Sequence, residues 1–65
     1  MYSALRGRII EKYGSQREFA RVIGLSEVSI TKKMNNRTEF SKSDIERWAE
    51  LLEIKKNDIP KYFFA

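Results

Sequence analysis

The 65-residue sequence contains no cysteine and no histidine, so neither a disulfide framework nor a thiolate or imidazole metal site is available. It has one proline and no Asn-Gly or Asp-Gly turn, and apolar and polar residues do not alternate as they do in strands. No apolar run exceeds a few residues, and the start, "MYSALRGR", lacks the order of a signal peptide. We therefore expect one cytoplasmic domain, residues 1–65, without strands, metal or cofactor.

Charge is distributed unevenly along the chain, whose net charge is +4. Residues 1–37 hold eight Lys or Arg against three acids, net +5, whereas residues 38–65 hold five against six, net −1. This asymmetry suggests a side that faces a polyanion in the N-terminal half. The alternative is that these lysines and arginines only solvate the outer faces of helices.

Helix signals recur about every dozen residues. Over residues 3–13 the apolar positions fall on one stripe, and Gly14 suits the left-handed conformation that follows a helix end. Gly7, in the middle of this segment, lowers helix stability, and we interpret it as a point where a neighbouring helix or backbone approaches closely.

The next two helices are expected to be short and joined by a tight turn. Ser15 and Glu18 have the spacing of a reciprocal capping box, and Gly24 ends the helix that they begin. Ser26 is placed to cap the following helix, with Ile30 on its buried face, and that helix should fray near residues 35–36.

The remaining segment has the clearest helix start. Ser41 and Asp44 form a second capping box, and Ile45, Trp48 and Leu52 repeat at helical spacing. We expect Trp48 to be a core residue rather than a stacking platform for a nucleobase. A short helical turn should follow near residue 60, so the predicted fold is all-α, a compact bundle of four to five short helices.

Residues 15–35 meet the requirements of a helix-turn-helix: a small residue at Ala20, a glycine turn at Gly24 and apolar anchors at Leu25 and Ile30. The stretch "SQREFARVIGLSEVSITKKMNN" resembles the Cro and lambda-repressor-type helix-turn-helix domains of phages and their bacterial relatives. The segment "LRGRIIEKYG" and the "FFA" end further resemble small Cro-like proteins of prophages in Gram-positive bacteria. The family often has a second anchor where this chain has Lys33, and here Met34 takes that place, which leaves the rotation of the helix open.

The resemblance implies sequence-specific binding of double-stranded DNA, with residues 26–34 in the major groove. The outward face of that helix supplies the residues expected to read base edges: Glu27, Val28, Thr31 and Lys32. For Lys32 a contact with phosphate alone is the alternative, and for Thr31 a hydrogen bond within its own helix. The residues expected to contact phosphates are Gln16, Arg17, Ser26, Ser29, Lys33, Asn36 and Arg37. For one of Asn35 and Asn36 we favour a role in forming the turn.

Three consecutive aromatics, Tyr62, Phe63 and Phe64, exceed what the core of so small a domain needs. We expect them to serve partly in the core and partly in a two-fold interface with a second copy, with Phe64 the most exposed to that copy. One recognition helix covers too few base pairs to define a site, so a homodimer on a palindrome is expected.

The function predicted on this basis is a Cro-like phage or prophage repressor in the bacterial cytoplasm or nucleoid, acting as a homodimer without a small-molecule effector. Two alternatives remain open: an antitoxin of the same fold, and an anti-repressor-type module that binds a protein. Glu27 and Val28 motivate the second, because an acid and a hydrocarbon are unusual on a face that meets phosphates. We do not expect an enzyme, since no nucleophile–base pair or phosphate loop is present.

Overall fold

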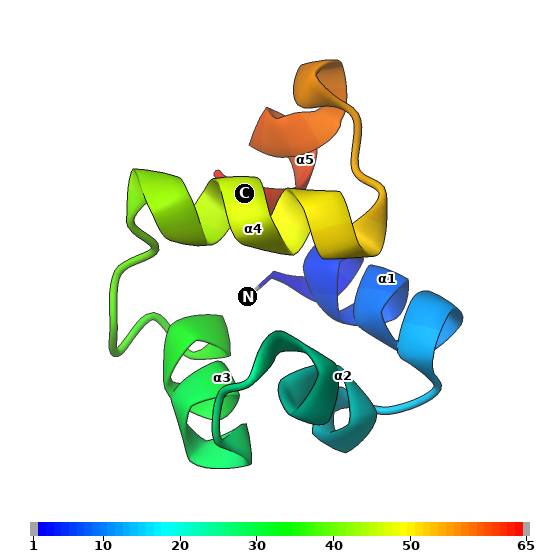
Figure 1. The fold of residues 1–65 in the computed structure, drawn as a ribbon. Helices are drawn as coiled ribbons and strands as arrows, with labels where there is room; N and C mark the ends of the chain where they lie inside the picture. Colours follow the sequence, from blue (N-terminus) through cyan, green and yellow to red (C-terminus); the bar gives the residue numbers. More distant parts are fainter. Residues whose placement is uncertain (1, 65) are drawn as a thin grey trace.

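The computed structural model describes residues 2–64, which form helices and contain no strand. The elements are α1 (Ser3–Tyr13), α2 (Gln16–Ile23), α3 (Glu27–Met34), α4 (Lys42–Leu52), a 3₁₀ turn η1 (Lys56–Asp58) and α5 (Ile59–Phe63). α1 packs against α2, α4 and α5, and Figure 1 shows α2 and α3 next to each other on the side of the molecule opposite α4 and α5. The all-α bundle predicted from the sequence is confirmed. No helix within residues 2–64 is long and apolar enough to cross a membrane.

The starts of α2 and α3 are fixed by serine caps, as their sequences predict. The Ser15 hydroxyl accepts a hydrogen bond from the Glu18 N–H at 3.0 Å, and the Ser26 hydroxyl accepts one from the Ser29 N–H at 3.1 Å. The carboxylate of Glu18 pairs with Arg21 rather than returning to the Ser15 backbone. Only the serine half of the predicted capping box is therefore formed at the start of α2, because Arg21, one turn along the helix, binds the Glu18 carboxylate.

The predicted capping box at the start of α4 is complete. The Ser41 hydroxyl accepts from the Asp44 N–H at 3.1 Å, and the Asp44 carboxylate accepts from the Ser41 N–H at 3.0 Å. Phe40, immediately before the cap, packs its ring edge-on against Trp48 with a centroid distance of 4.8 Å. Local sequence chemistry thus sets where α4 begins and how it enters the core.

Left-handed residues end three of the helices where the chain turns back. Gly14 and Gly24 have φ of 82° and 83°, values that a glycine adopts without steric cost. Glu53 ends α4 with φ of 53°, a conformation that costs a residue with a Cβ roughly 1 kcal/mol. That end of α4 is consequently the one that needs support from elsewhere in the chain.

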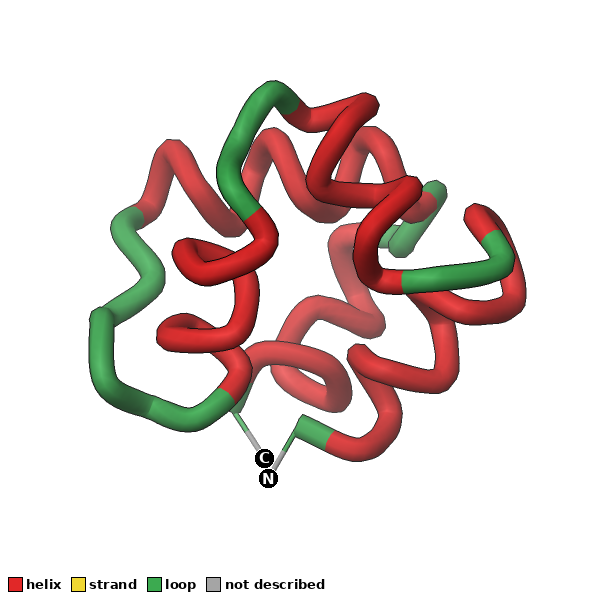
Figure 2. The backbone as a smooth tube through the Cα atoms, turned by 90° about the horizontal axis from the view of Figure 1, so that it is seen from below, coloured by secondary structure: helices red, strands yellow, loops and turns green. Residues whose placement is uncertain are grey.

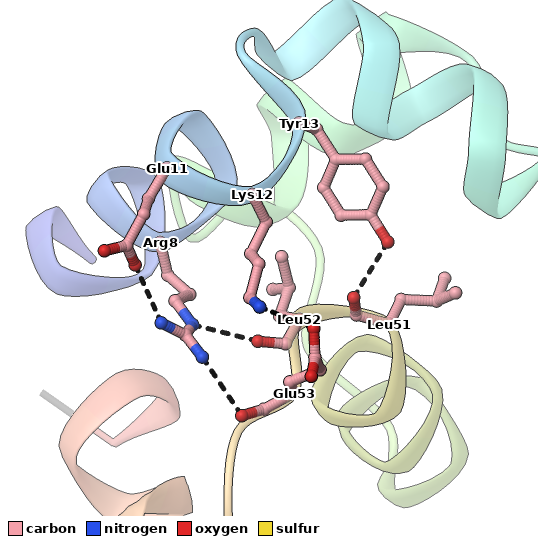
Figure 3. A network of polar contacts seen from close by, with 7 residues as sticks. All are labelled: Arg8, Glu11, Lys12, Tyr13, Leu51, Leu52 and Glu53. Carbon is pink, nitrogen blue, oxygen red and sulfur yellow. Dashed lines mark hydrogen bonds and ion pairs between the residues drawn. The ribbon is translucent and has the colours of Figure 1, made fainter.

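α1 supplies this support through Arg8, as Figure 3 shows. The guanidinium donates from Nε to the carbonyl oxygen of Leu52 at 2.9 Å and from Nη2 to the carbonyl oxygen of Glu53 at 3.1 Å. The last carbonyls of a helix have no partner within the helix, and a cation at this end is also favoured by the helix dipole. Arg8 therefore caps α4 from a helix more than forty residues earlier in the sequence.

Two further side chains of α1 reach the same end of α4 (Figure 3). The Lys12 ammonium pairs with the Glu53 carboxylate, and this hydrogen bond holds the pKa of Glu53 below its usual value. The Tyr13 hydroxyl donates to the carbonyl oxygen of Leu51 at 2.8 Å. The second half of α1 is thus occupied with holding the end of α4.

The core contains one tryptophan surrounded by other aromatic rings. Trp48 is 1% exposed, and the Phe19 ring packs against its edge with a centroid distance of 4.9 Å. The prediction that Trp48 is a core residue is confirmed. The buried residues are Leu5, Ile9, Phe19, Ala20, Ile23, Ile30, Met34, Trp48, Ala49, Leu52, Ile54 and Phe63.

Candidate functional site

The turn between α2 and α3 is fixed by the backbone and by one arginine. The N–H groups of Gly24 and Leu25 both donate to the carbonyl oxygen of Ala20 at 3.0 Å, which closes the end of α2. Arg47 of α4 donates from Nη2 to the carbonyl oxygen of Ile23 at 3.1 Å. α3 therefore leaves the body of the molecule at a direction set by several hydrogen bonds rather than by one flexible glycine.

The rotation of α3 about its axis follows from its two anchors. Ile30 and Met34 are 0% and 1% exposed, so Met34 takes the inward place that Lys33 cannot. Leu25, which the sequence predicted as an anchor beside Ile30, is 37% exposed, so that prediction was wrong. The side chains on the opposite face are exposed, and they are Glu27, Val28, Thr31 and Lys32. The outward face predicted from the sequence is the one that the structure presents.

These four residues line a surface hollow of about 340 Å³ together with two residues of the segment that follows α3. Its full lining is Glu27, Val28, Thr31, Lys32, Asn35 and Arg37. Val28 is 64% exposed, which places an apolar side chain in water on this face. We call this feature the α3 hollow.

Gln16 is tied to α3 within the chain. Its amide Nε2 donates to the Thr31 hydroxyl at 2.9 Å, a contact between the first turn of α2 and the outward face of α3. The bond occupies one donor of the group that was expected to hold a phosphate. It also fixes the Thr31 hydroxyl at the edge of the hollow.

Ser26 and Ser29 are both used in the cap of α3. The Ser26 hydroxyl accepts the Ser29 N–H and also donates to the Ser29 hydroxyl at 3.0 Å. Arg17 is exposed on α2. None of these three side chains lines the α3 hollow.

Lys33 is directed away from the hollow and toward α4. Its ammonium lies 2.9 Å from Oδ2 of Asp44 and 5.5 Å from the centroid of the Phe40 ring, and its side chain is only 11% exposed. The Ser41 N–H and the Lys33 ammonium, which both donate to the Asp44 carboxylate, hold the pKa of Asp44 below its usual value. Lys33 thus joins α3 to α4 rather than standing free with the other cations.

The segment after α3 is held by a residue near the start of the chain. Asn36 has φ of 62°, and its side-chain oxygen accepts a hydrogen bond from the Tyr2 hydroxyl at 3.0 Å. The Arg37 N–H returns to the carbonyl oxygen of Lys32 at 2.8 Å, as in helix ends closed by a left-handed residue. Asn36 therefore has the turn-forming role, whereas Asn35 lines the hollow.

Sequence reasoning missed Tyr2 as part of this arrangement. It lies 34 residues from its hydrogen-bond partner, and no local pattern links them. Figure 2 shows the segment between α3 and α4 as a long outer loop, and the hydrogen bond from Tyr2 joins this loop to the start of the chain.

The three C-terminal aromatics have different environments. Phe63 is 3% exposed and packs edge-on against Phe40 with a centroid distance of 5.2 Å, so it belongs to the chain's own core. Tyr62 is half-buried, and Phe64 is 68% exposed. Of the expected dimer residues, Phe64 is the one that offers an apolar surface to another molecule.

Comparison with known proteins gives a family and a similar solved structure. The model of a family described as a protein of unknown function (DUF739) matches residues 1–65, and the chain belongs to this family. The solution structure of the modulator of repression (MOR) of the temperate bacteriophage TP901-1 from Lactococcus lactis matches with 43% sequence identity and a TM-score of 0.88. The match covers 97% of this chain and 85% of that one. No curated protein matches this chain.

These findings correct the assignment made from the sequence. The family is not that of the Cro and lambda-repressor-type domains, and the similar structure is that of a modulator of repression rather than of a repressor. The prediction of a Cro-like, DNA-binding repressor was therefore wrong. The physical reason is visible on α3, where an acid and an exposed valine occupy the outward face while Lys33 is bound to Asp44.

Proposed function

We propose that this chain is a modulator of repression that acts by binding a repressor protein. The observation that carries the proposal is the 43% identity, over 97% of this chain, with the modulator of repression of a temperate phage. Identity at this level over nearly the whole chain goes with the same fold, as the TM-score of 0.88 indicates. The proposal agrees with the anti-repressor-type alternative that the outward face of α3 suggests.

The α3 hollow is the surface that suits a protein partner best. Val28 offers an apolar contact, and Glu27 and Lys32 beside it carry opposite charges. Protein interfaces combine an apolar centre with a polar, charged rim, whereas a DNA backbone attracts only the cations. We assign the side chains Glu27, Val28, Thr31 and Lys32 to contacts with the repressor, and no catalytic step or small-molecule effector is needed.

Calorimetric titration of the purified chain with the repressor encoded in the same genome tests the proposal. We expect a saturable complex and a loss of affinity of about 5- to 30-fold for Val28→Ala, since truncation of a central apolar contact typically costs about 1–2 kcal/mol. Alanine is a good helix former, so α3 keeps its structure in this variant.

Ile10→Ala is the matched control. Ile10 is 48% exposed on α1 and does not line the hollow, so the same kind of truncation there should leave the affinity unchanged. Absence of any complex with the repressor would refute the proposed function. Equal effects of the two variants would place the binding surface elsewhere.

A further inference from the structure

The α3 hollow has a charge pattern that its own fold does not neutralise. Within residues 2–64, the basic side chains in ion pairs are Arg8, Lys12, Arg21 and Lys33. Lys32 and Arg37, which line the hollow, form no ion pair with an acidic residue among these residues, and Glu27 forms none with a basic residue. Four of the eight basic residues in residues 1–37 are therefore engaged, and of the other four, Lys32 and Arg37 line the hollow whereas Arg6 and Arg17 do not.

The negative and positive charges that line the hollow are separated along the axis of α3. Glu27 is the first residue of α3 and Lys32 lies five residues later, which corresponds to roughly 7.5 Å along the helix axis. Val28 lies between them in the sequence. The order of Glu27 and Lys32 also suits the dipole of α3 itself, but Arg37 lies beyond the end of the helix.

The backbone at Arg37 is supported by hydrogen bonds within the chain. The Arg37 N–H donates a hydrogen bond to the carbonyl oxygen of Lys32, and the Tyr2 hydroxyl donates one to the side-chain oxygen of the preceding Asn36. Two cations that line the hollow are thus carried on a supported backbone. A supported backbone loses less conformational entropy when its cations bind a carboxylate than an open loop does.

From this arrangement we infer that the α3 hollow receives a protein segment carrying a carboxylate next to an apolar side chain. The carboxylate pairs with Lys32 and Arg37, the apolar side chain packs on Val28, and Glu27 rejects a second acid at the other end of the hollow. This inference deepens the proposed function and rests on it for the identity of the partner. The chemistry of the hollow itself is testable without that partner.

Selection from a phage-displayed library of random 16-residue peptides on the immobilised chain provides the test. Enriched peptides should place Asp or Glu next to Leu, Ile, Val or an aromatic residue. They should bind the double variant Lys32→Glu/Arg37→Glu at least tenfold more weakly than the natural chain. Arg6→Glu/Lys55→Glu, which makes the same change in net charge at two exposed positions outside the hollow, should bind them as the natural chain does.

Three outcomes would overturn the inference. One is enrichment without an acidic residue or no enrichment at all. Another is equal loss of binding in the two double variants, which would indicate general attraction to a cationic protein. The third is enrichment of acidic runs without an apolar residue.

Repressor binding by the same variants separates this inference from the proposed function. A repressor that binds Lys32→Glu/Arg37→Glu as well as the natural chain contradicts the inference and leaves the proposed function standing. Peptides that behave as expected, together with a repressor that does not bind at all, refute the proposed function and leave the chemistry of the hollow standing.

Discussion

Gly7 lies in the middle of α1 with solvent beside it. A Cβ built at this position meets no atom within 4 Å, so the interpretation of Gly7 as a point of close approach within the chain was wrong. Its φ is not positive either, and no feature of the described residues requires a glycine there. The residue thus lowers helix stability without a compensating contact inside the molecule.

Gly7→Ala should therefore stabilise the protein by about 1 kcal/mol, the usual difference between glycine and alanine inside a helix. Thermal unfolding followed by the fluorescence of the buried Trp48 would measure the change. Gly14→Ala is the matched comparison, because its Cβ also meets nothing but its φ is 82°. That variant should be less stable than the natural protein, and a gain in stability at Gly14 would contradict the assignment of both effects to backbone conformation.

Tyr2 acts on the hollow from a distance. Tyr2→Phe removes the hydroxyl that donates to Asn36 and retains the ring, whose edge-on contact with Phe40 has a centroid distance of 5.6 Å. We expect a small loss of stability, about 0.5 kcal/mol, since the bond is exposed. The larger effect should be faster hydrogen exchange of the Arg37 amide, because the segment that carries it loses its tether. Unchanged exchange at Arg37 would show that Tyr2 does not support the hollow.

At the scale of elements, α3 and α4 are joined by Lys33. Its ammonium meets the carboxylate that also completes the cap of α4, so one acid, Asp44, serves both helices. The serine caps and the helices themselves could be predicted from the sequence, since each depends on residues three or four apart. The contacts from Lys33, Arg8 and Tyr2 could not, because their partners lie 11 to 45 residues away and no local pattern selects them.

The pairing of Asp44 predicts a dependence of stability on pH. Because the folded chain holds the pKa of Asp44 below its usual value, the ionised carboxylate stabilises the fold above the ordinary aspartate pKa of about 3.9. This contribution is lost as the pH falls from there through the folded pKa. Asp44→Asn should lower the free energy of unfolding near neutral pH by about 1 kcal/mol and make its loss in acid shallower.

Denaturant unfolding between pH 7 and pH 2.5 would measure both effects. Glu50→Gln is the control, since Glu50 is exposed on the same helix and forms no ion pair with the described residues. If Asp44→Asn kept the full acid dependence of the natural protein, the coupling of α3 to α4 through this carboxylate would be wrong.

At the scale of the whole molecule, the fold could be read from the sequence and the function could not. Ala20, Gly24 and Ile30 are demanded by the packing of two short helices, whatever the outer face of the second helix binds. The outward residues of α3 were identified correctly, but their partner was inferred from a shared scaffold. Glu27 and Val28, which are exposed and have no role in the core, favoured the protein-binding alternative, and this alternative agrees better with the comparison than a DNA-binding repressor does.

The proposal that this chain acts on a repressor rather than on DNA is tested most directly by a gel-shift experiment with three components. We expect that the chain alone does not retard the operator of the repressor encoded with it, and that adding the chain to the repressor–operator complex changes the amount or the mobility of the bound DNA. The change should be weaker with Val28→Ala. A specific shift of operator DNA by the chain alone, with no effect on the repressor, would contradict the account.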